Sequence, residues 1–224
     1  MAHQKHSPRR QPATRCYLCG ATQDLTRDHV PPANLFPEPR PSDLITVPCC
    51  RNCNQSYSLD DEAMRVWLAA AANRSASGDW IWRERVVGGT FQRSPALRSS
   101  FAQSAVQVLA ERKGIQFPAV AITIPDERAN RYFVRIVKGL LTHLYPEFEY
   151  SSHAFQIDHL TPQADDIGML FSRFTYGERG GGVFRFFHQV VSDPPMGFWV
   201  LVFYDWACFL VVHQPPEGLP LADR

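Results

Sequence analysis

The chain has 224 residues, of which 45% are apolar and 12% aromatic, and its net charge is +1. A chain of this length permits one large domain or two small ones, and its apolar content is sufficient for a packed core, which excludes a disordered protein. The near-zero net charge excludes a polycation that binds nucleic acid through its overall charge alone.

The N-terminal residues 1–14 are polar, basic and proline-containing, and they show no periodicity. We predict a flexible tail here. The tail belongs to a basic region, because residues 1–58 carry seven basic against four acidic residues, a balance of +3 that leaves −2 for residues 59–224. A basic region beside a near-neutral body is suited to a polyanionic partner such as nucleic acid.

Two CxxC pairs lie in the segment 15–58, namely Cys16 with Cys19 and Cys50 with Cys53. Two thiolates at this spacing can bind one tetrahedral Zn²⁺ ion, and a second pair from a distant segment completes the site. The segment has few apolar repeats, so metal binding, about 10–16 kcal/mol for structural zinc, must contribute to its folding. Cys49 adjoins the second pair and could compete as a ligand, but only Cys50 keeps the paired spacing.

The cysteine usage also indicates a compartment. Six cysteines with zinc-type spacing, and no apolar leader at the N-terminus, favour a reducing cytoplasm over a disulfide framework. The longest apolar stretch, residues 198–212, is too short to span a bilayer and is interrupted by Asp205. We interpret this stretch as two paired strands, with Cys208 as an ordinary core residue, and we expect a soluble cytoplasmic protein without membrane contact.

Beyond Tyr57 the pattern becomes helical. Apolar residues at helical spacing, including Met64 and Trp67, predict a helix that follows Ser58. A second amphipathic helix is expected at residues 96–113, ended by Gly114. A short strand is expected at 118–124, and then a third helix that Asp126 caps and Pro146 ends.

The last third of the chain is rich in β-branched and aromatic residues. We predict an antiparallel meander of three strands, at residues 183–191, 197–205 and 207–214. The middle strand is apolar on both faces, so we expect helices on one face and the cysteine segment or a partner on the other. The predicted fold class is α+β, with a small zinc-stabilised module and a helical and antiparallel β-sheet body.

Three further histidines invite a functional interpretation, but a structural one is preferred. Asp158 and His159 form an Asp-His pair without neighbouring ligand residues, which we interpret as hydrogen bonding at a strand end. His188 and His213 lie on predicted strands, and we expect them to be satisfied sheet residues.

Between the CxxC pairs stands the run TRDHVPP, and Asn54 directly follows the second pair. This arrangement resembles the HNH endonucleases, and the runs LFPEPRPSDLITVPCCRNCN and SLDDEAMR are similar to a bacterial subgroup with a C-terminal extension. The resemblance covers about residues 16–65. It implies a ββα-metal module at residues 15–58 and an α+β extension at residues 59–224.

The resemblance implies a role for each matching residue. His29 matches the general base at the end of the first hairpin strand, and Asp28 matches the metal-binding acidic residue. Asn54 matches a position at which some members use asparagine as a metal ligand. The four cysteines of the CxxC pairs match the structural zinc ligands.

Phosphodiester chemistry agrees with these roles. A divalent cation must neutralise charge on the scissile phosphate and the leaving oxygen. Asp28 and Asn54 offer oxygen donors suited to Mg²⁺ or Mn²⁺, and the imidazole of His29 titrates near neutrality and can accept a proton from water. Arg27 and Arg51 are candidates for contacting the phosphate. We expect His29, Asp28 and Asn54 to surround one cation and to cleave nucleic acid, with DNA favoured.

Two alternatives stay open. The middle asparagine of the motif is absent, and Asp43, Thr46 or Asn34 would have to brace the loop, which favours a non-catalytic zinc module that binds nucleic acid or protein. The body could also bind a small ligand or a protein of its own, with the nuclease as its effector. The oligomeric state is open, although a homodimer would suit double-strand cleavage.

Overall fold

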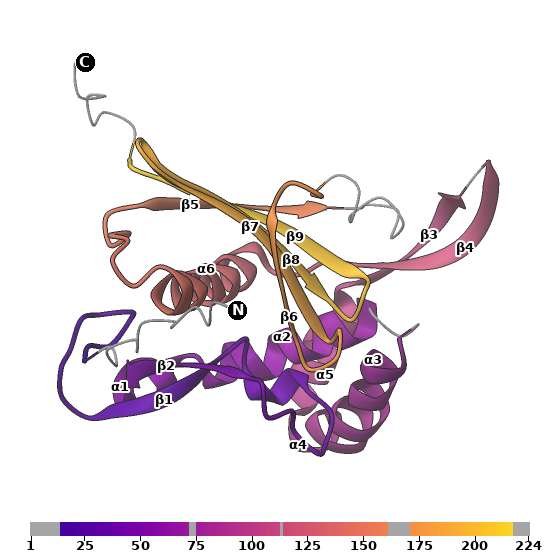
Figure 1. Cartoon of the computed structure of the whole chain (residues 1–224). Helices are drawn as coiled ribbons and strands as arrows, with labels where there is room; N and C mark the ends of the chain where they lie inside the picture. Colours follow the sequence, from indigo (N-terminus) through magenta and orange to yellow (C-terminus); the bar gives the residue numbers. More distant parts are fainter. Residues whose placement is uncertain (1–13, 72–74, 113, 161–170, 217–224) are drawn as a thin grey trace, which may run out of the picture.

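The computed structural model describes residues 14–71, 75–112, 114–160 and 171–216 (Figure 1); apart from Thr14, the predicted tail at 1–14 lies outside them. The helices are α1 (Arg51–Ser56), α2 (Ser58–Ala71), α3 (Ala76–Trp80), α4 (Phe91–Arg93), α5 (Pro95–Gln103) and α6 (Asp126–Leu144), with the 3-10 helix η1 (Ala33–Leu35) and the π-helix η2 (Ile81–Thr90). The strands are β1 (Leu25–Val30), β2 (Ile45–Cys50), β3 (Ala105–Arg112), β4 (Ile115–Ile122), β5 (Ala154–Leu160), β6 (Thr175–Arg179), β7 (Phe184–Ser192), β8 (Pro195–Phe203) and β9 (Ala207–Gln214). No helix within the described ranges is long and apolar enough to cross a membrane.

Residues 15–58, here called the cysteine lobe, contain the antiparallel hairpin β1–β2 and the short helix α1 directly after it. The first CxxC pair forms a tight turn, in which the Cys16 N–H donates to the Ala21 carbonyl at 2.7 Å. Gly20 closes this turn at φ +75°, a conformation that glycine adopts at little cost. The strand–strand–helix order predicted for this segment is therefore present.

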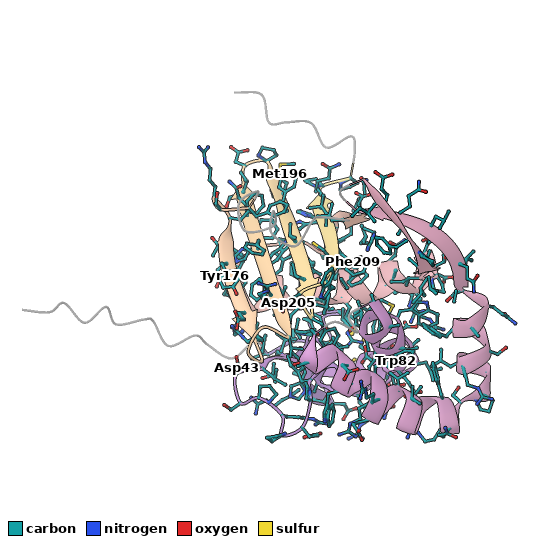
Figure 2. All side chains as sticks on the ribbon, turned by 90° about the vertical axis from the view of Figure 1, so that its right-hand side faces the viewer. Asp43, Trp82, Tyr176, Met196, Asp205 and Phe209 are labelled. Carbon is teal, nitrogen blue, oxygen red and sulfur yellow. The ribbon has the colours of Figure 1, made fainter. Side chains whose placement is uncertain are left out.

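The centre of the body is a five-stranded sheet with the order β5-β9-β8-β7-β6. Every neighbouring pair is antiparallel, and β8 pairs with β9 over residues 197–213. The predicted meander is therefore confirmed, and the long apolar stretch forms two paired strands. In Figure 2, Tyr176 marks the edge strand β6, Met196 lies near the start of β8, and Asp205 lies just past its end.

Helices cover one face of the sheet, as predicted, but the cysteine lobe packs on this same face with α6 (Figure 1). Of the two alternatives for the opposite face, the one that placed the lobe there is wrong. Trp199, Leu201 and Phe203 of β8 belong to one continuous core with apolar residues of α2, α6 and the lobe. The alternate residues Val200 and Val202 belong to a smaller cluster on the other face. The loop between β1 and β2 carries apolar residues that are buried in this same core, and their burial holds the lobe on the α6 face of the sheet.

Several contacts attach the lobe to the body, and the following are among them. The Tyr204 hydroxyl donates to the Leu35 carbonyl at 2.6 Å, and both residues are buried. The Gly180 N–H lies 3.2 Å from one carboxylate oxygen of Asp43. In α6, a Cβ on Gly139 would lie 2.5 Å from Cγ2 of Val30, so only glycine allows the helix this close to β1.

The predicted helix at residues 96–113 is only half correct. Helix α5 ends at Gln103, and residues 105–112 form β3, which pairs with β4. Gly114 is the turn residue between these strands, at φ +78°, rather than the end of a helix. The Ala-Val-Gln-Val run pairs with a strand that follows it, and such pairing overrides local helix propensity. The strand predicted at 118–124 is present and begins three residues earlier, at Ile115.

Candidate metal and catalytic site

The four paired cysteines form one cluster. The Sγ atoms of Cys16, Cys19, Cys50 and Cys53 all lie within 4.8 Å of one another, and those of Cys19 and Cys50 are 3.7 Å apart. Zinc–sulfur bonds of about 2.3 Å at tetrahedral angles place sulfur atoms about 3.8 Å apart. This cluster could therefore bind a metal ion such as Zn²⁺.

The thiol of Cys16 is prepared for metal binding. Burial by itself would raise its pKa, but backbone N–H groups, with Cys50 first, outweigh burial and lower the pKa to about 6. The Cys53 N–H similarly approaches the Cys50 sulfur at 3.5 Å. Cys49 lies close by, with its Sγ 4.0 Å from that of Cys16, but burial raises the pKa of the Cys49 thiol. Cys49 is not one of the four cysteines whose Sγ atoms all lie within 4.8 Å of one another, so the geometry selects Cys50, as the paired spacing predicts.

The hairpin presents different side chains on its two faces. Asp28 and Val30 are buried, together with their cross-strand partners Val47 and Ile45, and this inner face packs against α6. Because neighbouring strand residues alternate, His29 lies on the outer face. Asp28 and His29 therefore lie on opposite faces of this strand, as the alternation of strand residues predicts.

His29 is half-buried on the outer face, opposite Thr46. Burial lowers the pKa of the His29 imidazole, and Arg40 and Arg27 lower it further, whereas Asp28 raises it. The imidazole forms no hydrogen bond with another residue in the described part of the chain. It is therefore neutral at pH 7 and able to accept a proton.

The two arginines proposed to contact phosphate lie in different elements, Arg27 within β1 and Arg51 at the start of α1. Arg27 is exposed on the outer face with His29, and its Nη2 donates to the Thr46 hydroxyl at 3.1 Å. Arg51 is exposed at the start of α1, where its backbone N–H donates to the Asp24 carbonyl. Of the two arginines, only Arg27 therefore lies on the outer face of the hairpin with His29.

Asp28 belongs to a buried charge network on the inner face. Its Oδ2 accepts a hydrogen bond from the Tyr17 hydroxyl at 2.7 Å and lies 3.6 Å from Nε of Arg135 in α6. Burial, and then Asp28, raise the pKa of Tyr17, so the tyrosine keeps the proton that it donates. Among the described residues no donor contacts the other carboxylate oxygen, Oδ1, which leaves it available to a cation.

The same arginine binds a second carboxylate. Arg135 Nη1 lies 2.9 Å from Oδ1 of Asp61, Nη2 lies 3.1 Å from Oδ2, and the guanidinium lies 4.8 Å from the ring centre of Tyr57. Burial would lower the pKa of Arg135, but Asp61 and Asp28 outweigh it and raise it. For Asp61, burial prevails over Arg135 and raises the pKa to about 6. One buried arginine thus joins the hairpin, α2 and α6.

Asn54 of α1 lies on the inner side with Asp28. Its Nδ2 donates to the Thr26 hydroxyl at 3.1 Å, and this hydroxyl donates in turn to the Cys49 carbonyl at 2.8 Å. Because the hydroxyl proton is already used, the hydroxyl oxygen must accept from the amide, which fixes the orientation of the Asn54 side chain. Oδ1 of Asn54 is left without a hydrogen-bond donor among the described residues. The structure therefore brings two oxygen donors, Asp28 and Asn54, to one face.

Asn34 braces the loop between the hairpin strands, a role for which the sequence left three candidates. Its Nδ2 donates to the backbone carbonyl of Asp61 at 2.9 Å, which attaches the loop to α2. Asp43 instead contacts the sheet at Gly180, and Thr46 accepts from Arg27.

Sequence reasoning missed Tyr17, Asp61 and Arg135 as members of this site. The sequence analysis gives none of these three residues a role in the site. One signal was present, because Arg135 stands three residues after Tyr132 and four before Gly139, in line with a buried helix face. The network itself requires three segments to meet, which spacing along one element does not indicate.

His188 has a polar partner, as predicted, whereas His213 is only partly satisfied, because its Nε2 is buried without a hydrogen bond among the described residues. Nδ1 of His188 lies 3.0 Å from the Tyr145 hydroxyl, and Nδ1 of His213 lies 2.9 Å from Nδ1 of His153. Asp158 accepts from the Gln156 side chain at 3.2 Å within β5.

In comparisons with known proteins, no family model matches the chain, and no curated protein or solved structure matches it significantly.

Proposed function

We propose that this chain is a metal-dependent endonuclease of the HNH type that hydrolyses phosphodiester bonds in nucleic acid, with DNA as the favoured substrate. The observation that carries the proposal is the hairpin β1–β2 with helix α1, which the four-cysteine cluster ties together. It holds a neutral imidazole, His29, on the same strand as Asp28, and it holds Asn54 beside that strand. The resemblance to HNH endonucleases around TRDHVPP and Asn54 assigns roles to these residues.

The donor chemistry fits a hard divalent cation. Oδ1 of Asp28 and Oδ1 of Asn54 lack donors among the described residues, and oxygen ligands are those that Mg²⁺ and Mn²⁺ prefer. A bound cation would supply neutralisation of the charge on the phosphate. Arg135, on the other oxygen of Asp28, would hold this carboxylate in its orientation.

His29 would act from the outer face. Its lowered pKa keeps the imidazole neutral near pH 7, as a general base requires. Arg27 and Arg40, whose charges reach His29, would attract the phosphate backbone to this face. Because His29 and Asp28 lie on opposite faces of β1, the substrate would have to reach around the hairpin to contact both.

A supercoiled-plasmid assay with Mg²⁺, Mn²⁺ or a chelator tests the proposal. The parent protein should convert the plasmid only when the divalent ion is present, and His29→Ala should reduce the rate about a hundredfold or more. Gln55→Ala, an exposed neighbour of Asn54, is the matched control and should cut at the parental rate. The acidic limb of the parental pH–rate profile should have its midpoint below 6.5, because protonation of His29 removes the base.

A non-catalytic zinc module is the second candidate, and one observation favours it. The Arg135 guanidinium already neutralises Asp28 at 3.6 Å, so the carboxylate has a cation without any metal. Under this alternative the purified protein carries zinc and binds nucleic acid, but no divalent ion induces cleavage. A His29→Ala protein that cuts as fast as its parent would reject the endonuclease with His29 as base.

A further inference from the structure

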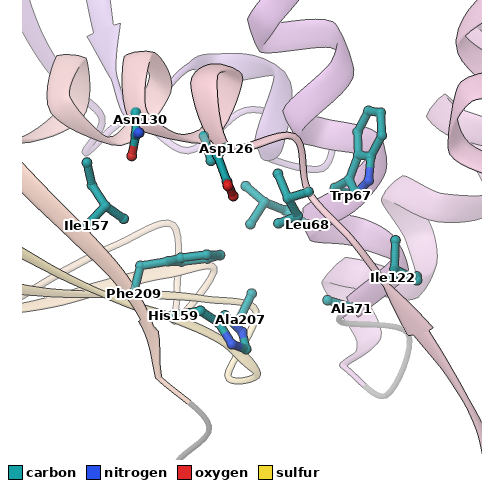
Figure 3. Close-up of a pocket in the computed structure, with 12 residues that line it drawn as sticks. Trp67, Leu68, Ala71, Ile122, Asp126, Asn130, Ile157, His159, Ala207 and Phe209 are labelled. Atoms are coloured by element: carbon teal, nitrogen blue, oxygen red, sulfur yellow. The ribbon is translucent and has the colours of Figure 1, made fainter. Parts of the chain in front are cut away.

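A cavity of about 540 Å³ opens in the body, away from the cysteine lobe, between α2, β4, the start of α6, β5 and β9 (Figure 3). Its floor is apolar and rigidly packed. Trp67, Leu68 and Phe209 line it and are at most 4% exposed. The volume lies within the range of about 300–1,000 Å³ that is typical of small-molecule sites.

Three polar side chains stand at the rim of this cavity. Asp126 and Asn130 extend from the first turns of α6, and Figure 3 shows both pointing toward Phe209. His159 approaches from β5, with its ring 5.3 Å from that of Phe209. In the described part of the chain, none of these three side chains forms a hydrogen bond or an ion pair.

Among the described residues, no cationic side chain pairs with the carboxylate of Asp126. The nearby arginines of α6, Arg128 and Arg131, are paired with Asp60 at 3.4 and 3.2 Å. Asp126 is the first residue of α6 and does not serve as its cap, which is Pro125. Negative charge is favoured at a helix N-terminus. Asp126 is exposed, so its carboxylate is accessible to a cationic ligand at the edge of the apolar cavity.

The three groups can all accept a hydrogen bond. Asp126 offers carboxylate oxygens, Asn130 offers its amide oxygen, and His159 offers a ring nitrogen when it is neutral. Burial lowers the pKa of His159, which keeps the ring neutral at pH 7. A primary ammonium group presents three N–H donors and one positive charge. It complements this rim, whereas a carboxylate or phosphate would be repelled.

We propose that this cavity is a binding site for a small primary amine with an aromatic or aliphatic body, the body on the Trp67–Leu68–Phe209 floor and the ammonium group on Asp126 and Asn130. The site is independent of the proposed nuclease activity. It would give the C-terminal body a ligand of its own.

Titration calorimetry with the full-length, metal-loaded protein tests this assignment. The probes are 2-phenylethylamine, tryptamine and hexylamine, and 2-phenylethanol is the uncharged match of the first. At least one amine should bind with a Kd below about 1 mM, and the alcohol should bind at least about tenfold more weakly, because a hydrogen bond to a charged group is lost.

Three variants locate the binding. Asp126→Asn keeps the shape of the side chain and should weaken amine binding about tenfold or more. Glu127→Gln makes the same charge change one residue further on, outside the cavity lining, and should leave binding unchanged. Ala129→Leu, on the cavity wall, should abolish binding of every probe by filling the space. Unliganded thermal unfolding of each variant, compared with the parent, shows that the fold is retained.

Several outcomes would overturn the assignment. One is that no amine binds at millimolar concentration. Another is that 2-phenylethanol binds as well as 2-phenylethylamine, since this would remove the role of the ammonium group. A third is amine binding that survives both Asp126→Asn and Ala129→Leu, which would place the ligand elsewhere.

Discussion

Arg135→Met tests whether the buried arginine holds the lobe and the body together. Methionine keeps much of the length and the apolar stem of the side chain but removes the charge. The Arg135 side chain is 2% exposed, and its guanidinium lies 2.9 Å from Asp61 and 3.6 Å from Asp28. The substitution would leave two buried carboxylates without their shared cation.

The expected loss is about 3–5 kcal/mol of the free energy of unfolding at pH 7, the usual cost of removing one partner of a buried ion pair. The loss should also depend on pH. Burial already raises the pKa of Asp61 to about 6, and removing Arg135 removes the group that opposes burial most. A carboxyl group with a raised pKa destabilises the fold above that pKa, and the penalty is relieved as pH falls and the folded state takes up the proton. The variant should therefore approach the parent in stability between pH 7 and pH 5.

Urea unfolding followed by circular dichroism at pH 7 and pH 5 measures both effects. Arg131→Met, one turn earlier on α6, is the matched control. Its side chain is 49% exposed and pairs with Asp60 at 3.2 Å, so its removal should cost at most about 1 kcal/mol. Equal losses for the two variants, or a loss at Arg135 that grows as pH falls, would refute the reasoning.

Three further predictions follow from the packing. Cys53→Ser should release bound zinc and unfold the lobe, because structural zinc contributes about 10–16 kcal/mol. Metal analysis together with near-ultraviolet circular dichroism checks this. A variant that stays folded and keeps its zinc would contradict the role of Cys53 as a zinc ligand. Gly139→Ala should destabilise the fold by about 1–3 kcal/mol through the 2.5 Å approach to Val30, despite the better helix propensity of alanine. Val30→Ala added to it should recover part of the loss in thermal unfolding, and a stabilised single variant would argue against the close approach. Burial lowers the pKa of His213 to about 4, so the unfolded chain binds the proton first and about 3 kcal/mol of stability should be lost between pH 6.5 and pH 4. His213→Gln should flatten this part of the stability curve, and an unchanged slope would count against the assignment.

Much of the local structure could be predicted, since the residues that determine it lie close together in the chain. The spacing of Cys16 and Cys19 predicted a metal-binding turn, and the apolar run at 198–212 predicted two paired strands. The helix expected at residues 96–113 failed at its second half. The strand β3 depends on β4, a partner that becomes adjacent only when the turn at Gly114 forms.

The sequence by itself determined which residue types could bind a metal or transfer a proton, because that chemistry belongs to the side chains. Strand alternation also placed Asp28 and His29 on opposite faces of one strand. Only the tertiary structure decided what each face contacts. Arg135 reaches Asp28 from more than a hundred residues away, and three segments must pack into one core before a buried guanidinium can replace water around the two carboxylates. Local spacing could not indicate that contact, because its energy comes from desolvation, which exists only in the folded chain.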